Sequence, residues 1–180
     1  MVTFTFVNLF NNHVETIFIK IDFISYCVCV LFSFSLKVTS FNIYGIKSSV
    51  GTLQRLAEDY DIILLQEHWL YPDELPYVSN ICNDFCSFSL SPMSIEDKLI
   101  QGRPHGGVSI MWKKSFSQHT KIIQYDDNRI IGLEFKTNTY DLLFVCVYLP
   151  YECDFHYDDC FFLHRIESII ETANTPYTFV

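Results

Sequence analysis

This 180-residue chain is poor in basic residues, with 12 Lys and Arg against 21 Asp and Glu, which gives a net charge of −9. A protein that holds nucleic acid through bulk charge needs an excess of basic side chains, so this balance counts against tight passive DNA binding. An enzyme that holds a phosphodiester through a divalent cation is not excluded, because the cation offsets the negative field locally. A disordered chain is excluded, since 49% of the residues are apolar.

The sequence also lacks the cysteine patterns of zinc ribbons and disulfide-rich domains. Its seven cysteines contain no pair of Cys-x-x-Cys units, and their odd number leaves one without a disulfide partner. Cys146 lies in an apolar run and is interpreted as a small buried hydrophobe. We therefore expect reduced thiols and an intracellular protein, nuclear or cytoplasmic.

A long apolar run is missing as well. The uncharged stretch at residues 23–36 has 14 residues, whereas a helix that crosses a bilayer needs about 20. A signal-peptide core is the alternative, but no clear cleavage pattern follows it. We expect no stable membrane partner and interpret residues 1–35 as a leader of uncertain origin outside the domain. Residues 36–180 then form a single partial domain, because the final stretch TPYTFV reads as the beginning of a strand.

From residue 36 onward the pattern is typical of an α/β domain. A β-prone run at 36–43 and a continuous apolar run at 62–65 flank a segment whose apolar residues recur at helical spacing. Closely spaced runs, typical of antiparallel strands, follow at 85–90, 107–112, 120–125, 130–135 and 142–148. A last helix is expected around residues 162–173. The pattern predicts an α/β fold in which a layered β-sandwich is flanked by helices.

Three polar side chains stand where predicted strands end. Asn42 ends the first strand, Glu67 follows the second in LLQEHW, and Tyr148 ends the last one before Pro150. A carboxylate at such an edge can hold Mg²⁺, and a carboxamide and a phenol can donate hydrogen bonds to phosphate oxygens. Taken singly, each residue can also be explained without a function, as a turn former or a solvated side chain.

Taken together, these runs resemble the endonuclease/exonuclease/phosphatase superfamily with its DNase I-like fold. In style they resemble the apurinic endonuclease-like domain of non-LTR retrotransposons. The matching runs are LKVTSFNIYGI (36–46), DIILLQEHWL (61–70), GRPHGGVSIMWKKS (102–115), RIIGLEF (129–135) and LLFVCVYLPY (142–151). The resemblance implies metal-dependent hydrolysis of a nucleic acid phosphodiester, with Mg²⁺ as the cofactor and Mn²⁺ as the alternative.

The resemblance also implies roles for single residues. Glu67 matches the metal ligand, Asn42 the phosphate-orienting amide, and Tyr148 the catalytic contact to the scissile phosphate. Arg103 matches a position that could face the substrate backbone. Tyr44 stands where members commonly carry Asp or Asn, so one supporting contact is expected to be missing.

Two later motifs of the superfamily, Gly-Asp-Phe-Asn and Ser-Asp-His, do not occur in this sequence. They supply the water-orienting group and the general-base histidine, and His68, which should point away from Glu67, does not replace that base. We therefore expect a C-terminally incomplete domain with weak or no activity. Two alternatives remain: a phosphoinositide or sphingolipid phosphatase or phosphodiesterase of the same fold, and a catalytically inactive fragment. No sequence feature indicates an oligomeric state.

Overall fold

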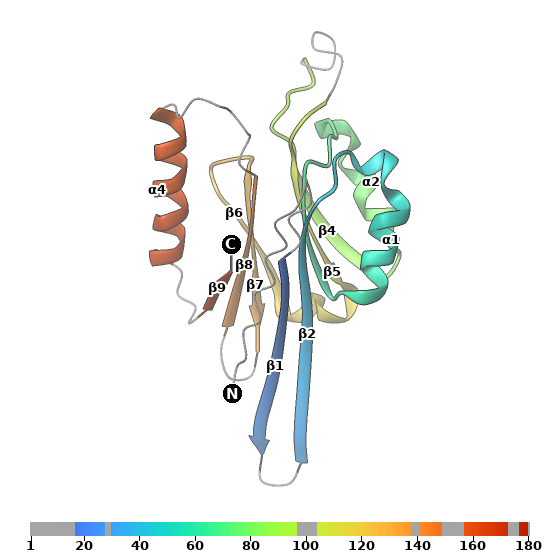
Figure 1. The fold of residues 1–180 in the computed structure, drawn as a ribbon, viewed down its shortest axis with the longest axis vertical. Helices are drawn as coiled ribbons and strands as arrows, with labels where there is room; N and C mark the ends of the chain where they lie inside the picture. The colour runs from blue at the N-terminus through green and yellow to red at the C-terminus, as the bar shows by residue number, and fades with distance from the viewer. Residues whose placement is uncertain are drawn as a thin grey trace.

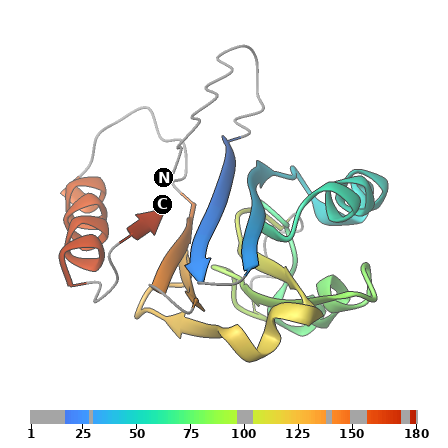
Figure 2. The same ribbon diagram turned by 90° about the horizontal axis from the view of Figure 1, so that it is seen from below.

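The computed structural model describes residues 17–27, 30–96, 104–137, 141–148, 157–172 and 177–179. Within these ranges two β-sheets pack face to face, with helices on both outer sides (Figures 1 and 2). The predicted α/β sandwich with flanking helices is therefore confirmed. None of the described helices is both long and apolar enough to cross a membrane.

The first sheet has five strands in the order β1-β2-β3-β5-β4. These strands are β1 (Ile17–Cys27), β2 (Val30–Asn42), β3 (Ile62–Gln66), β4 (Phe85–Leu90) and β5 (Val108–Lys113). β2 and β3 run parallel, because the chain returns between them through η1 (Ile46–Ser48) and α1 (Val50–Asp59). After β3, η2 (Pro72–Glu74) and α2 (Pro76–Ser79) lead to β4, and η3 (Lys114–His119) follows β5.

The second sheet has four strands in the order β6-β7-β8-β9. β6 (Thr120–Gln124), β7 (Ile130–Lys136) and β8 (Asp141–Val147) form the antiparallel part that their close spacing predicted. α4 (Tyr157–Thr172) then leads to β9 (Tyr177–Phe179), which pairs parallel to β8.

Alternation along the strands divides the core into layers. In β3, Ile62 and Leu64 face the second sheet, where they join the cluster that contains Phe144. Ile63 and Leu65 face the opposite way, against α1 and α2. A strand that is buried on both faces needs apolar residues at every position, which explains the continuous run of four apolar residues. The outer face of the second sheet is covered by α4 through Ile166 and Ile169, which belong to a separate cluster.

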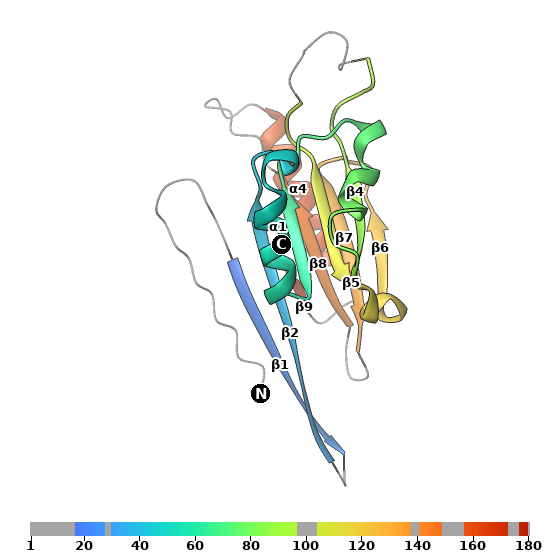
Figure 3. The same ribbon diagram turned by 90° about the vertical axis from the view of Figure 1, so that its right-hand side faces the viewer.

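The first predicted strand is longer than expected, since β2 begins at Val30 rather than near Leu36. Its partner β1 comes from the stretch that was interpreted as a leader, and the two strands pair antiparallel from Ile17↔Ser40 to Cys27↔Val30. β3 contacts β2 only from Val38 to Asn42. The outer half of this hairpin therefore extends beyond the sandwich, as Figure 3 shows.

We propose that residues 1–35 are not required for the domain to fold. A chain that begins at Leu36 should fold cooperatively, because β2 keeps β3 as its partner and Leu36 and Val38 keep their places in the core between the sheets. Circular dichroism and thermal unfolding of the full and shortened chains test this. A clear loss of folded protein on shortening would show instead that β1 is an integral strand.

Candidate active site

Asn42, Glu67 and Tyr148 meet at one edge of the two sheets. Asn42 ends β2, Glu67 directly follows β3, and Tyr148 directly follows β8. The Asn42 Nδ2 donates a hydrogen bond to Glu67 Oε1 over 3.0 Å, and the Tyr148 phenol lies close enough to Glu67 for the carboxylate charge and a hydrogen bond to raise the pKa of the phenol. Strands that end at the same edge bring their last residues together, so residues up to 106 positions apart in the sequence (42 to 148) become neighbours.

Trp69 is a contact of Glu67 that the sequence did not indicate. Its indole Nε1 donates to Glu67 Oε2 over 3.1 Å. The Glu67 carboxylate is therefore held by a carboxamide at one oxygen and by an indole at the other. In the sequence, the only indication of this contact is that Trp69, a hydrogen-bond donor, follows Glu67 by two residues. Such a spacing is too common to be informative.

Tyr148 remains a hydrogen-bond donor at neutral pH. Burial is the largest effect that raises the pKa of its phenol, followed by the charge of Glu67, the hydrogen bond to Glu67 and the charge of Tyr44. A phenol whose pKa lies above its ordinary value near 10 keeps its proton. Tyr148 can thus donate to an oxygen atom on which negative charge develops.

The backbone at this edge adopts rare conformations. Among the described residues, positive φ angles at non-glycine positions occur at Tyr44 (47°), Glu67 (57°) and Trp69 (56°). A left-handed conformation costs an L-residue about 1–2 kcal/mol, and such strain tends to gather where side chains must be aimed for function. All three strained residues belong to this edge.

Backbone hydrogen bonds hold the strained loop after β3 in place. The Glu67 N–H donates to the Gly107 carbonyl over 2.8 Å, and the Trp69 N–H donates to the Gly106 carbonyl over 3.0 Å. On the other side, the Gly45 N–H donates to the Glu67 carbonyl over 2.8 Å. Three loops that are distant in sequence are thereby tied together around Glu67.

Gly107 permits this arrangement because its backbone lies directly against the ring of His68. Its φ is 92°, and a Cβ atom there would stand 2.3 Å from His68 Cε1. Gly45 has the same relation to Trp69, with φ 92° and a Cβ position 2.6 Å from Cε3. Both glycines are needed for close approach as well as for backbone conformation.

His68 is a buried structural residue. The Leu70 N–H donates to its Nδ1 over 3.0 Å, so Nε2 carries the proton and donates to the Leu90 carbonyl over 2.9 Å. Burial lowers the pKa of His68 from 6.5 to about 4. The unfolded chain would bind this proton below about pH 6.5, so the stability that neutral His68 contributes declines as the pH falls from 6.5 toward 4.

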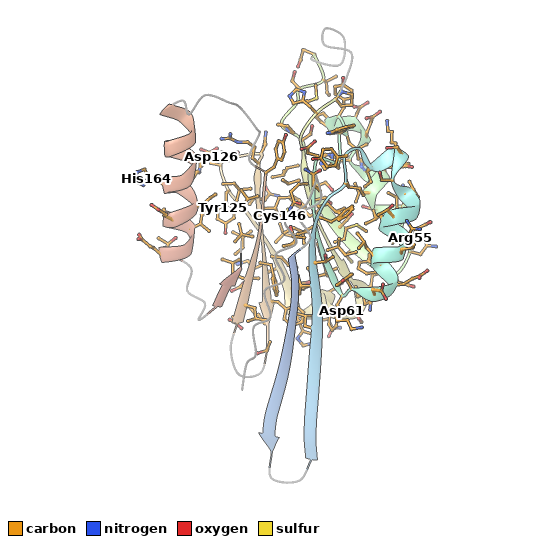
Figure 4. The ribbon with its side chains drawn as sticks, viewed as in Figure 1. Arg55, Asp61, Tyr125, Asp126, Cys146 and His164 are labelled. Atoms are coloured by element: carbon orange, nitrogen blue, oxygen red, sulfur yellow. The ribbon has the colours of Figure 1, made fainter. Side chains whose placement is uncertain are left out.

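A polar link between the sheets lies beneath the site. Gln66 Nε2 donates to Ser40 Oγ over 2.9 Å and contacts Cys146 Sγ at 3.4 Å. Cys146 lies between the two sheets in Figure 4, and its Sγ also contacts the Leu65 carbonyl at 3.4 Å. Burial raises the pKa of this thiol to about 12, so Cys146 is the inert buried residue that the sequence predicted. The link fixes the strand that leads to Glu67 against the strand that leads to Tyr148.

Tyr44 supports Asn42 through its backbone. The Tyr44 N–H donates to Asn42 Oδ1 over 3.2 Å, which leaves the Nδ2 end of the amide directed at Glu67. The departure from Asp or Asn at this position thus removes a carboxylate or amide but keeps Asn42 oriented. Arg103, the remaining predicted site residue, lies outside the described residues.

The site fits a cation that is shared with the substrate. Within the described ranges no group of three or more His, Cys, Asp and Glu side chains could hold a metal ion. Mg²⁺, however, is commonly bound through one or two carboxylates together with phosphate oxygens and water. A carboxylate has about four acceptor positions. Glu67 can therefore accept hydrogen bonds from Asn42, Trp69 and Tyr148 and still offer a lone pair to a cation.

The sequence of residues 39–175 matches the endonuclease/exonuclease/phosphatase family. No curated protein sequence matches the chain. Among solved structures, the 3′ phosphatase NExo from Neisseria, in a variant bound to a product DNA hairpin, is 18% identical with a TM-score of 0.54; the match covers 79% of this chain and 55% of that one. An AP endonuclease from Archaeoglobus fulgidus is 18% identical with a TM-score of 0.52 and coverages of 77% and 52%.

These likenesses show the DNase I-like fold that the motifs predicted. The chain spans about half the length of both structures.

The contact between Gly107 and His68 yields a stability prediction. Gly107→Ala should lower the free energy of unfolding by about 2 kcal/mol or more, because the His68 ring is hydrogen-bonded through both nitrogens and cannot retreat. For a chain of this size that corresponds to a Tm lower by at least about 4 °C. The matched control is Gly51→Ala in α1, where a Cβ would meet nothing within 4 Å, and which should stabilise by about 0.5–1 kcal/mol. Similar Tm values for the two variants would contradict this account.

Proposed function

Since this chain belongs to the endonuclease/exonuclease/phosphatase family, we propose that it is a metal-dependent DNA endonuclease domain in the style of non-LTR retrotransposons. The observation that carries the proposal is the convergence of Asn42 and Tyr148 on the Glu67 carboxylate. This arrangement combines one anionic cation ligand with two neutral hydrogen-bond donors, which is what a phosphodiester requires. DNA as the substrate class is supported by the similar Neisseria structure, which is bound to a DNA hairpin.

Glu67 would hold Mg²⁺, with Mn²⁺ as the alternative, and the bound ion supplies positive charge to the phosphate oxygens. Trp69 and Asn42 fix the rotamer of Glu67 by donating to its two oxygens. The carboxylate is therefore already oriented before a substrate arrives. That saves the reorganisation that a freely rotating side chain would need during the reaction.

Asn42 and Tyr148 would stabilise the charge that builds on the phosphate. The Asn42 carboxamide has two N–H donors; one is directed at Glu67, and the other would serve a phosphate oxygen. The protonated Tyr148 phenol would transfer its hydrogen bond from Glu67 to a second phosphate oxygen. Removing one such donor typically costs about 2.7–4 kcal/mol of barrier, or about 10²–10³ in rate.

We propose no general base among these 180 residues. The two motifs that would supply one do not occur in the sequence, and His68 is buried with both ring nitrogens engaged. Catalytic groups that act as a unit are strongly non-additive, so we propose weak cleavage by the chain as it stands. We further propose an intracellular location, nuclear or cytoplasmic, and a substrate-backbone contact for Arg103.

Cleavage of abasic and plasmid DNA with Mg²⁺ tests the function, together with Mn²⁺ binding followed by electron paramagnetic resonance. The chain should bind Mn²⁺ in the presence of DNA and cleave slowly at most. Glu67→Gln keeps the shape of the side chain but removes its charge, so it should abolish Mn²⁺ binding and reduce any cleavage at least about 100-fold. Glu58→Gln, at an exposed position on α1, is the matched control and should change neither.

Other results would point to the alternatives. Mn²⁺ binding and cleavage that survive in Glu67→Gln would contradict the proposed site. Faster hydrolysis of a phosphoinositide or sphingolipid than of DNA would favour a lipid phosphatase of the same fold. Absence of both Glu67-dependent Mn²⁺ binding and hydrolysis would identify an inactive chain. Rapid cleavage that is lost in Glu67→Gln would reveal a base within these residues.

A further inference from the structure

Tyr44 presents an exposed aromatic ring beside the candidate active site. Its exposed fraction is 43%, the larger of the two values for exposed tyrosines in the described part of the chain. The ring packs edge-to-face on Trp69, with centroids 6.3 Å apart and an interplanar angle of 85°. Through its backbone N–H the same residue orients Asn42.

The backbone of Tyr44 does not explain why an aromatic residue occupies this position. With φ at 47°, glycine or asparagine would fit at a lower cost than a bulky side chain. Burial does not offset that cost, because nearly half of the residue is exposed. An exposed aromatic ring on a strained backbone next to a catalytic site suggests a ligand-binding role.

The indole of Trp69 joins this ring to the metal ligand. It contacts the Tyr44 ring on one side and donates to Glu67 Oε2 on the other. Tyr44 also lies near enough to Tyr148 for its charge to contribute to the raised pKa of that phenol. The exposed ring is therefore held at a fixed place next to the group of side chains that would bind a phosphate.

The charge of the chain favours a contact that does not depend on cations. With a net charge of −9, the protein has little bulk attraction for a polyanion. Stacking of bases on aromatic side chains supplies affinity that is tolerant of sequence, and it requires a base whose face is uncovered. A base inside a perfect duplex is covered on both faces by its neighbours.

We propose that Tyr44 stacks on an unpaired nucleobase next to the phosphate bound at Asn42, Glu67 and Tyr148, so that the chain prefers single-stranded or unpaired DNA to perfect duplex. The position of the phosphate rests on the proposed function. The stacking itself does not require the chain to cleave, which allows the two ideas to be tested separately.

The test is equilibrium binding by the 180-residue chain in EDTA, with oligonucleotides that carry 2-aminopurine, whose fluorescence is quenched by stacking. Dissociation constants are measured for a single strand, a mismatched duplex and a perfect duplex. Tyr44→Asn removes the ring and tolerates the left-handed backbone, whereas Tyr44→Phe keeps the ring. Tyr77→Asn on α2 is the matched control, because Tyr77 is also exposed, at 38%, and lies on a different element.

Tyr44→Asn should weaken single-strand binding about 5- to 150-fold, which corresponds to about 1–3 kcal/mol for one stacked base. It should also remove the quenching and the preference over perfect duplex. Tyr44→Phe should stay within about twofold of the unsubstituted chain, as a ring stacks without its hydroxyl. Tyr77→Asn should bind unchanged, and thermal unfolding establishes that each variant is folded.

Three results would overturn the inference: unchanged affinity and quenching in Tyr44→Asn, an equal loss in Tyr44→Phe, or no measurable binding by the unsubstituted chain. If Tyr44→Asn has no effect while Glu67→Gln abolishes Mn²⁺ binding, the stacking role fails and the proposed function stands. If Tyr44→Asn loses binding while Glu67→Gln keeps Mn²⁺, the proposed function fails and base stacking stands.

Discussion

The peptide groups on either side of Glu67 are fixed by hydrogen bonds from two separate loops, and the candidate site depends on this constraint. The Glu67 N–H is bound to the Gly107 carbonyl and the Glu67 carbonyl accepts from the Gly45 N–H. A residue held in this way can remain left-handed, at φ 57°, although that conformation is unfavourable by itself. The fixed backbone brings the carboxylate to the Asn42 amide and the Trp69 indole.

The packing beneath the loop stabilises the left-handed backbone at Glu67. His68 is buried directly behind Glu67, with both ring nitrogens engaged and its ring against Gly107. Gln66, which precedes Glu67 in the sequence, contacts Cys146 of the second sheet. Residues that flank the carboxylate are thus anchored in the core while the carboxylate itself stays at the edge. Preorganised electrostatic groups of this kind need a rigid support, and here the sandwich provides it.

The sequence allowed the layered fold and the meeting of Asn42, Glu67 and Tyr148 to be predicted, because each of these residues ends or directly follows a β-prone run and strand ends share an edge. It did not reveal the left-handed backbone at Glu67 and Trp69, since propensities describe common conformations and this one is imposed by tertiary hydrogen bonds. The Trp69 contact depends on that backbone and was missed with it. β1 was not predicted as a strand, because most of its pairing is with residues 30–37 of β2, beyond the residues 38–42 that pair with β3.

We propose that the constrained loop aims the Glu67 carboxylate at a cation shared with a phosphodiester. Anomalous diffraction from crystals of the chain with Mn²⁺ and a short oligonucleotide would locate this cation. The account predicts an anomalous peak in direct coordination with Glu67, with a phosphate of the oligonucleotide as a second ligand and within hydrogen-bonding reach of Asn42 and Tyr148. A peak at another site, with the Glu67 carboxylate bound only to its protein neighbours, would contradict it.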